Sequence, residues 1–181
     1  MDMDLSKISP ASFEAEILPH LDAAYNLALY MTRQEAAARD VVQESLLNAL
    51  KAWQRFNPGN PKAWLLMIVR RECLAYFRKS RIETYVDIDD EAAMTPADRA
   101  ALSQDGAAEH DLIARQNATT VRAAIAALPP PYREVILLRE IEDMAYLDIA
   151  QVLEAPLGTI MSRLSRARTQ LKALLVAEGL P

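Results

Sequence analysis

The chain is poor in the residues that build metal sites, disulfides and sheets. Its 181 residues include one cysteine, two histidines and four glycines. One cysteine excludes an intrachain disulfide framework, and together with two histidines it leaves too few ligands for a usual zinc site. No apolar run approaches the length of a membrane span, and the N-terminus lacks a signal-peptide pattern. We therefore expect a soluble cytoplasmic protein that holds no metal and no cofactor.

Hydrophobic residues make up 51% of the chain, which is enough for one or two small cores. The scarcity of glycine and of β-branched runs favours an all-α fold. Apolar residues recur at helical spacing between clear stop signals. Asn60 followed by Pro61 predicts a capped helix start, and the pattern from Thr32 to Glu35 predicts a capping box. The predicted helices span residues 13–31, 32–56, 61–81, 111–128, 131–140, 146–153 and 157–177.

Negative charge is concentrated in one segment. Residues 83–111 hold nine acids and one arginine, a net charge of −8, whereas the whole chain is at −5, so the rest is mildly basic. The segment has poor periodicity and contains Pro96 and Gly106. It predicts a flexible acidic linker, 82–111, between helical domains at 11–81 and 112–179. We hypothesise that this acidic linker folds back on the mildly basic parts of the chain.

The last predicted helix is basic on an acidic protein. Between Thr159 and Lys172 it has four cations and no acid. A shorter helix and a three-residue turn precede it, as in a helix-turn-helix. We expect Leu157, Ile160 and Leu164 to face the core. The remaining face combines hydroxyls with guanidiniums, which suit base edges and phosphates in a major groove. A solvated bundle helix is the alternative, but such a helix normally mixes both charge signs.

A second basic helix is predicted at 61–81. It holds six cations against one acid, Glu72, with Trp64, Tyr76 and Phe77 interleaved. Cations can follow phosphates and aromatic rings can stack on exposed bases, so this pattern suits a strand that is being separated. For Trp64 the simpler interpretation is a core residue, and the same holds for Cys73.

These segments resemble two regions of bacterial sigma factors of the extracytoplasmic function group, within the sigma-70 family. Residues 128–140, 146–153 and 158–168 resemble region 4. Residues 40–53 resemble region 2.2, and residues 64–71 with Arg78 and Lys79 resemble regions 2.3 and 2.4. The match covers nearly the whole chain outside the linker and the termini. It implies two helical domains that bind promoter DNA and core RNA polymerase, at its clamp helices and flap.

The resemblance also implies which residues make each contact. The polymerase-docking set recurs at i, i+3, i+4 and i+7 on one helical face, with an aromatic residue nearby: Asp40, Gln43, Glu44, Leu47 and Trp53. The residues implied to contact the promoter −10 element are Asn57, Asn60, Lys62, Arg70, Arg71 and Arg78. Those implied to contact the promoter −35 element are Thr159, Ser162, Arg163, Arg166 and Arg168. Alternatively, the leucine and tryptophan of the first set belong to the core, and the two asparagines are turn and cap residues.

The chain departs from the family pattern at several positions. Family members usually carry Asn and Asp at the positions of Arg71 and Ala75, Gly at Glu154, and a basic residue at Met161. If Glu154 needs positive φ, it is strained by about 1 kcal/mol. Family members carry a serine that caps the first helix of the motif, and this chain has Ala145 at that position. Either Asp143 therefore caps that helix, or the cap is absent. These changes alter the expected promoter preference but not the family.

The resemblance implies regulation by an anti-sigma factor that packs against both domains. One alternative is a sigma mimic, a protein that sequesters an anti-sigma factor without supporting transcription. Such a protein would not need the four cations of the last helix, which this chain keeps. A LuxR-type regulator would leave residues 40–53 without a role. An enzyme is the weakest alternative, because the sequence contains no nucleophile–base set and no Gly-rich phosphate loop.

Overall fold

Every regular element in the described part of the chain is helical, which confirms the all-α prediction. The computed structural model describes residues 10–56, 59–80 and 109–180. The α-helices are α1 (Pro10–Ile17), α2 (Leu21–Thr32), α3 (Glu35–Ala52), α4 (Pro61–Ser80), α5 (Glu109–Ala127), α6 (Pro130–Ile136), α7 (Tyr146–Leu153) and α8 (Leu157–Ala177). Short 3₁₀ turns at Leu18–His20 and Trp53–Arg55 and a π-helical turn at Leu137–Ile141 complete the described elements.

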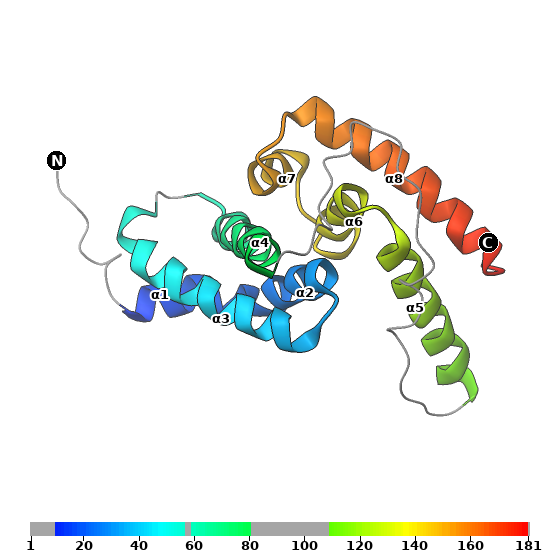
Figure 1. Cartoon of the computed structure of the whole chain (residues 1–181), viewed down its shortest axis with the longest axis horizontal. Helices are drawn as coiled ribbons and strands as arrows, with labels where there is room; N and C mark the ends of the chain where they lie inside the picture. Colours follow the sequence, from blue (N-terminus) through cyan, green and yellow to red (C-terminus); the bar gives the residue numbers. More distant parts are fainter. Residues whose placement is uncertain (1–9, 57–58, 81–108, 181) are drawn as a thin grey trace.

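Helices α1 to α4 form the N-terminal bundle (Figure 1). Helices α2, α3 and α4 pack against one another, and α1 packs on α4. Ile17, Leu27 and Leu65 are fully buried between them. The predicted helix 13–31 is divided at Pro19, because a proline has no N–H to continue the helical hydrogen bonds.

The predicted capping box at Thr32 is wrong. Thr32 is the last residue of α2, and its hydroxyl donates to the Ala28 carbonyl oxygen at 2.8 Å instead of capping the next helix. Arg33 then turns the chain with a left-handed φ of 58°, and α3 starts at Glu35 without a side-chain cap. The threonine hydroxyl bonds backward to its own helix, a local alternative that threonine commonly adopts.

The start of α4 agrees with the sequence. The Asn60 side-chain oxygen accepts a hydrogen bond from the Ala63 N–H at 3.3 Å, which caps the helix. Pro61 occupies the first helical position, where its missing N–H costs no hydrogen bond.

Helices α5 to α8 form the C-terminal half, and α6 packs against α8. The predicted helix 131–140 is α6 followed by the π-helical turn, in which Glu142 N–H donates to the Leu137 carbonyl at 3.0 Å. Helices α7 and α8 have the predicted bounds. The expected burial of Leu157 is wrong, since 39% of it is exposed, whereas Ile160 and Leu164 are buried. As the first residue of α8, Leu157 has no preceding helical turn to cover it.

The turn between α7 and α8 uses a left-handed residue. Glu154 has φ 51° and ψ 41° and ends α7, as its position in the motif predicted. Helix α7 starts after Ala145 with no side-chain cap, so the alternative of an absent cap is confirmed. Non-glycine residues in this conformation are strained, and other contacts must hold Glu154 there.

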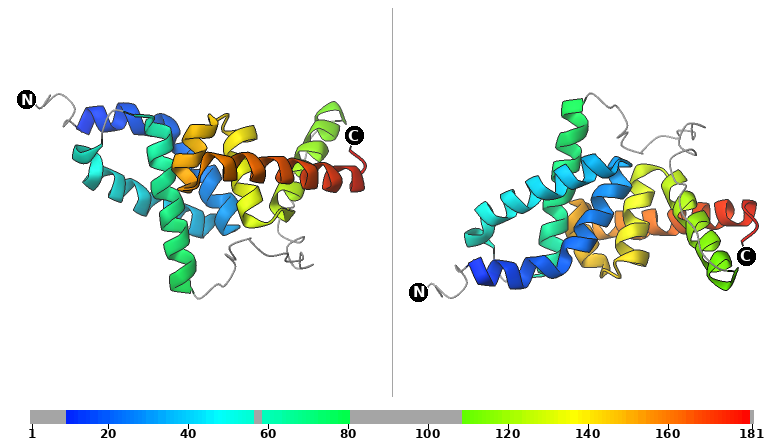
Figure 2. Two further views of the ribbon diagram at one scale, coloured as in Figure 1. Left: turned by 90° about the horizontal axis from the view of Figure 1, so that it is seen from above. Right: turned by 90° about the horizontal axis from the view of Figure 1, so that it is seen from below.

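The two halves of the chain pack together. Helix α4 lies against α7, and α2 lies against α6 (Figures 1 and 2). Buried apolar side chains from both halves form one continuous core. Most of the predicted linker, 82–108, lies outside the described residues, and its last three positions belong to α5. The hypothesis of linker fold-back therefore stays untested, whereas direct contact between the two halves is a finding.

Candidate nucleic-acid interface

The face of α8 that the sequence assigns to DNA lies at the surface. Ser162 and Arg166 are exposed, and Thr159 and Arg163 are partly exposed. Arg168 is exposed too, but its guanidinium donates to the Glu140 carboxylate at 2.7 and 2.9 Å, and this hydrogen bond raises the pKa of Arg168. The five predicted residues therefore all lie on α8, and the last of them, Arg168, is paired with the Glu140 carboxylate.

Three cations of α4 instead face acids of the C-terminal half. Lys62 pairs with the Glu142 carboxylate at 2.8 Å and also donates to the Glu142 carbonyl oxygen. Arg70 pairs with Glu134 at 3.2 Å, and their side chains are only 12% and 3% exposed. A buried ion pair is strongly destabilised when one partner is removed. These two contacts join helices that are distant in sequence.

Arg71 and Glu154 form a third pair across the same boundary. The Arg71 guanidinium donates two hydrogen bonds to the Glu154 carboxylate, at 2.5 and 3.3 Å. This hydrogen bonding lowers the pKa of Glu154 and raises that of Arg71. The contribution of Glu154 is thus present above its ordinary pKa and is lost as the pH falls through the lowered value. Two residues that depart from the family pattern are therefore each other's partner.

Asn60 contacts the C-terminal half while it caps α4. Its side-chain oxygen accepts from Ala63, and its amide nitrogen donates to the Asp148 carboxylate at 2.8 Å. The cap role expected for Asn60 is therefore present, and a DNA role for its amide requires the contact with Asp148 to open. Asn57, the other predicted asparagine, lies outside the described residues.

The far end of α4 is different. Arg78 and Lys79 are exposed in its last turn. Trp64 lies near the start of the helix and contacts Trp53 and Phe56, with ring centroids 6.0 and 4.9 Å away. Trp53 and Phe56 stack at 5.0 Å. This aromatic cluster supports the interpretation of Trp64 as a core residue. Both tryptophans pack at the start of α4.

The predicted polymerase-docking residues of α3 share an exposed face. Asp40, Gln43 and Glu44 are exposed. Leu47 is 46% exposed, which argues against the alternative that it belongs to the core. Leu50, one turn later, is 50% exposed as well. Trp53 is buried, so it can act on this face only by supporting its neighbours.

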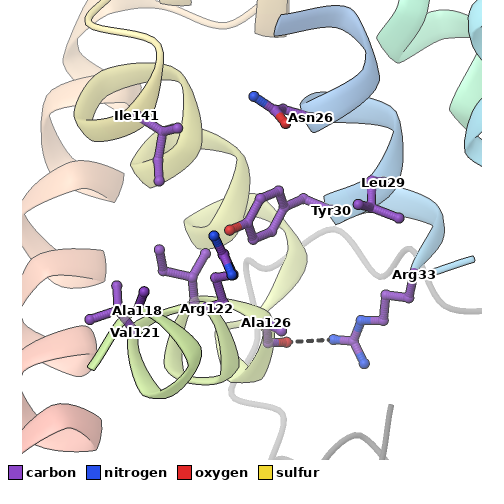
Figure 3. Close-up of a pocket in the computed structure, with 10 residues that line it drawn as sticks. Asn26, Leu29, Tyr30, Arg33, Ala118, Val121, Arg122, Ala126 and Ile141 are labelled. Carbon is purple, nitrogen blue, oxygen red and sulfur yellow. Dashed lines mark hydrogen bonds between the residues drawn. The ribbon is translucent and has the colours of Figure 1, made fainter. Parts of the chain in front are cut away.

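A pocket of about 640 Å³ lies between α2 and α5 (Figure 3). Leu29, Tyr30 and Val121 provide much of its apolar lining. Two arginines link the helices around the pocket by donating hydrogen bonds to backbone carbonyl oxygens. Arg33 donates to the Ala126 oxygen at 2.7 Å, and buried Arg133 donates to the Tyr30 and Ala126 oxygens at 3.1 and 2.7 Å. Sequence reasoning missed these contacts, because no local pattern marks them.

Cys73 provides a test of burial in α4. The thiol is fully buried, and burial raises its pKa to about 12, with the charge of Glu134 adding to the effect. Because the thiolate is the reactive form, we expect native protein to resist alkylation by iodoacetamide near neutral pH and to react fully in denaturant. Mass spectrometry of the two samples measures this. Equal rates in both would show that the thiol is accessible in the folded chain.

Other kinds of site are absent from the described ranges. Within residues 10–56, 59–80 and 109–180, no group of three or more His, Cys, Asp or Glu side chains is arranged to hold a metal ion. The same ranges contain no helix with the length and apolar character needed to cross a membrane.

Comparison with known proteins gives the family. Residues 17–82 match Sigma-70 region 2, and residues 119–171 match Sigma-70 region 4. The ECF RNA polymerase sigma factor EcfG of Rhodopseudomonas palustris is 34% identical over 169 residues, which cover 93% of this chain and 87% of that protein. The ECF RNA polymerase sigma factor SigW of Bacillus subtilis is 26% identical, over 85% of this chain and 83% of that protein.

Two solved structures have a similar fold. The sigma factor RpoE from Bartonella quintana, in complex with the anti-sigma factor NepR, has a TM-score of 0.66 and 30% identity over 90% of this chain and 96% of that one. CnrH in complex with the cytosolic domain of CnrY has a TM-score of 0.64 and 25% identity over 93% of this chain and 90% of that one. With region 2, region 4 and their order all matched, the chain belongs to the sigma-70 family and is an RNA polymerase sigma factor of the ECF group.

Proposed function

We propose that this sigma factor recognises promoters at two points while it is bound to core polymerase. Helix α8 enters the major groove at the −35 element, and α4 with the loop before it contacts the −10 element. The exposed, acid-free face of α8 at Ser162 and Arg166 supports this most directly, because arginine and hydroxyl side chains match base edges and phosphates. In this proposal the domains are 11–81 and 112–179, and the acidic linker between them threads toward the RNA exit path of the polymerase.

The exposed face of α3 docks on the clamp helices. It presents the acids Asp40 and Glu44 beside the exposed leucines Leu47 and Leu50. An apolar centre with a charged rim is the usual composition of a protein interface. This face stays exposed while the two halves of the chain pack together, so it is available to polymerase in the free protein.

An anti-sigma factor controls the protein in this proposal. The Bartonella RpoE and CnrH structures are complexes with NepR and with the cytosolic domain of CnrY, respectively. Both align over at least 90% of this chain. We place the protein in the cytoplasm, where core polymerase is found, and assign it no catalytic activity of its own.

Reconstitution tests the proposed function. Purified chain is mixed with core RNA polymerase and a randomised promoter library, and initiated transcripts are sequenced. We expect a holoenzyme that selects one pair of −35 and −10 elements. Failure to form the holoenzyme or to initiate would contradict the proposal. A chain that binds an anti-sigma factor but never initiates would instead be a sigma mimic.

A further inference from the structure

Two large apolar side chains lie exposed on the first turns of α8. Leu157 is 39% exposed and Met161 is 53% exposed, and neither belongs to the buried core. They are four residues apart, so they lie on one face of the helix, one turn after the other. We propose that Met161, supported by Leu157, is a specificity residue that contacts the C5-methyl group of a thymine in the −35 element. This inference rests on the proposed role of α8 at that element.

The side chains around Met161 suit DNA better than a protein partner. Ser162 and Ser165 are exposed next to it, and Arg166 lies one turn after Ser162 on the exposed face. The helix contains no acid from Leu157 to Ala177. A methionine among hydroxyls and cations complements a groove that combines phosphates with base edges. The centre of a protein interface, in contrast, is depleted of charged residues.

Gly158 leaves the surface beside Met161 open. It is exposed in the first turn of α8, and a Cβ atom placed there would meet no other atom of the described residues within 4 Å. Its φ is not in the left-handed region. Neither packing nor backbone conformation therefore requires glycine here, and alanine is the better helix former. The open surface, three residues before Met161, lets a base pair approach the helix closely.

A methionine can favour only one kind of feature in the major groove. Its thioether has no hydrogen-bond donor and is a weak acceptor, so it does not pair with the polar groups of base edges. The apolar group that base pairs present in this groove is the methyl group of thymine. The methionine side chain is flexible and polarizable, so it can adapt to the position of that methyl group. Met161 lies in the second turn of α8, within the N-terminal part of a recognition helix that contacts bases.

The presence of Met161 where a basic residue is usual alters which base pair α8 can favour. A lysine or arginine at this position would donate to a phosphate or to the O6 and N7 atoms of guanine. Met161 removes that contact and provides an apolar one. We therefore expect the −35 element of this sigma factor to contain an A·T pair at the position that faces Met161.

The test removes the methyl group and the side chain separately. Holoenzyme with the wild-type, full-length chain first selects a −35 element from a promoter library randomised at that element. Each thymine of the selected element is then replaced, one at a time, by deoxyuridine, which lacks only the methyl group. We expect one replacement to reduce initiation about fourfold, the effect of burying one methyl-sized group. In holoenzyme with Met161→Ala, the same replacement should change initiation by less than about 1.5-fold.

Two further variants of α8 sharpen the test. Val176 is 56% exposed near the other end of the helix, so Val176→Ala is the matched control. It should keep the sensitivity of wild type to deoxyuridine, at about fourfold. Met161→Lys introduces a basic residue at the position, and it should transfer the preference there from A·T to G·C. An unchanged preference in Met161→Lys would count against the inference.

The outcomes separate this inference from the proposed function. Equal sensitivity of the wild-type and Met161→Ala holoenzymes to every deoxyuridine replacement would overturn the inference, and so would a selected −35 element without an A·T pair. Equal loss of initiation by Met161→Ala on all −35 sequences would also overturn it, because the side chain would then contact polymerase instead of a base. If wild-type holoenzyme neither initiates nor selects a −35 element, the proposed function itself is contradicted, and the inference falls with it.

Discussion

Replacing Arg166 by alanine should reduce initiation at promoters that depend on the −35 element by roughly 10- to 100-fold. Arg166 is exposed on α8, one turn after Ser162, on the face assigned to the major groove. A bidentate contact between arginine and a guanine contributes about 1–3 kcal/mol of discrimination. Because the side chain makes no contribution to the core, the free energy of unfolding should hardly change. Run-off transcription on the selected promoter and on −35 variants measures the effect.

The matched control for this prediction is Lys172→Ala. Lys172 is an exposed cation of the same helix but lies farther from its N-terminus. Loss of a phosphate contact weakens binding to all DNA sequences alike, and it lowers the dependence of log affinity on log salt concentration by about one. We therefore expect Lys172→Ala to lose affinity without a change in base preference. Equal losses on every −35 sequence for Arg166→Ala, or a loss confined to polymerase binding, would contradict the assignment of α8.

Much of the fold could be predicted from helical spacing and stop signals. Helices α7 and α8 have the predicted limits, because Pro156 separates them and their apolar positions repeat regularly. The error at Thr32 has a local cause. The same threonine can cap the following helix or bond backward to the preceding one, and the sequence pattern does not distinguish the two.

The site could be predicted only as two separate helices. The α8 face follows from its own sequence, since missing acids are visible there. The partners of α4 do not, because Arg70 and Glu134 are 64 positions apart, and Arg71 and Glu154 are 83 apart. Only the packing of α4 on α7 brings these groups together. One signal was present: the departures at Arg71 and Glu154 add opposite charges, which is the pattern expected of an ion pair.

Leu47→Asp should reduce the affinity for core polymerase by roughly 30- to 1000-fold. Leu47 lies at the centre of the exposed α3 face, between Glu44 and Leu50, and buries apolar surface only when a partner covers it. Central apolar side chains of an interface can contribute about 2–4 kcal/mol to binding. An aspartate there loses that contact and must also be desolvated beside Glu44. Titration of labelled sigma with core polymerase measures the dissociation constant.

The matched control is Leu18→Asp, which carries the same change at a leucine of nearly equal exposure. Leu18 is 45% exposed and Leu47 46%, but Leu18 belongs to the 3₁₀ turn between α1 and α2, outside the α3 face. Because both side chains are partly in water, the two variants should lose similar, small amounts of folding free energy. A difference between them in polymerase affinity then measures docking alone. If both variants bind core polymerase equally well, α3 is not the docking helix, and the polymerase must hold this sigma factor through another surface.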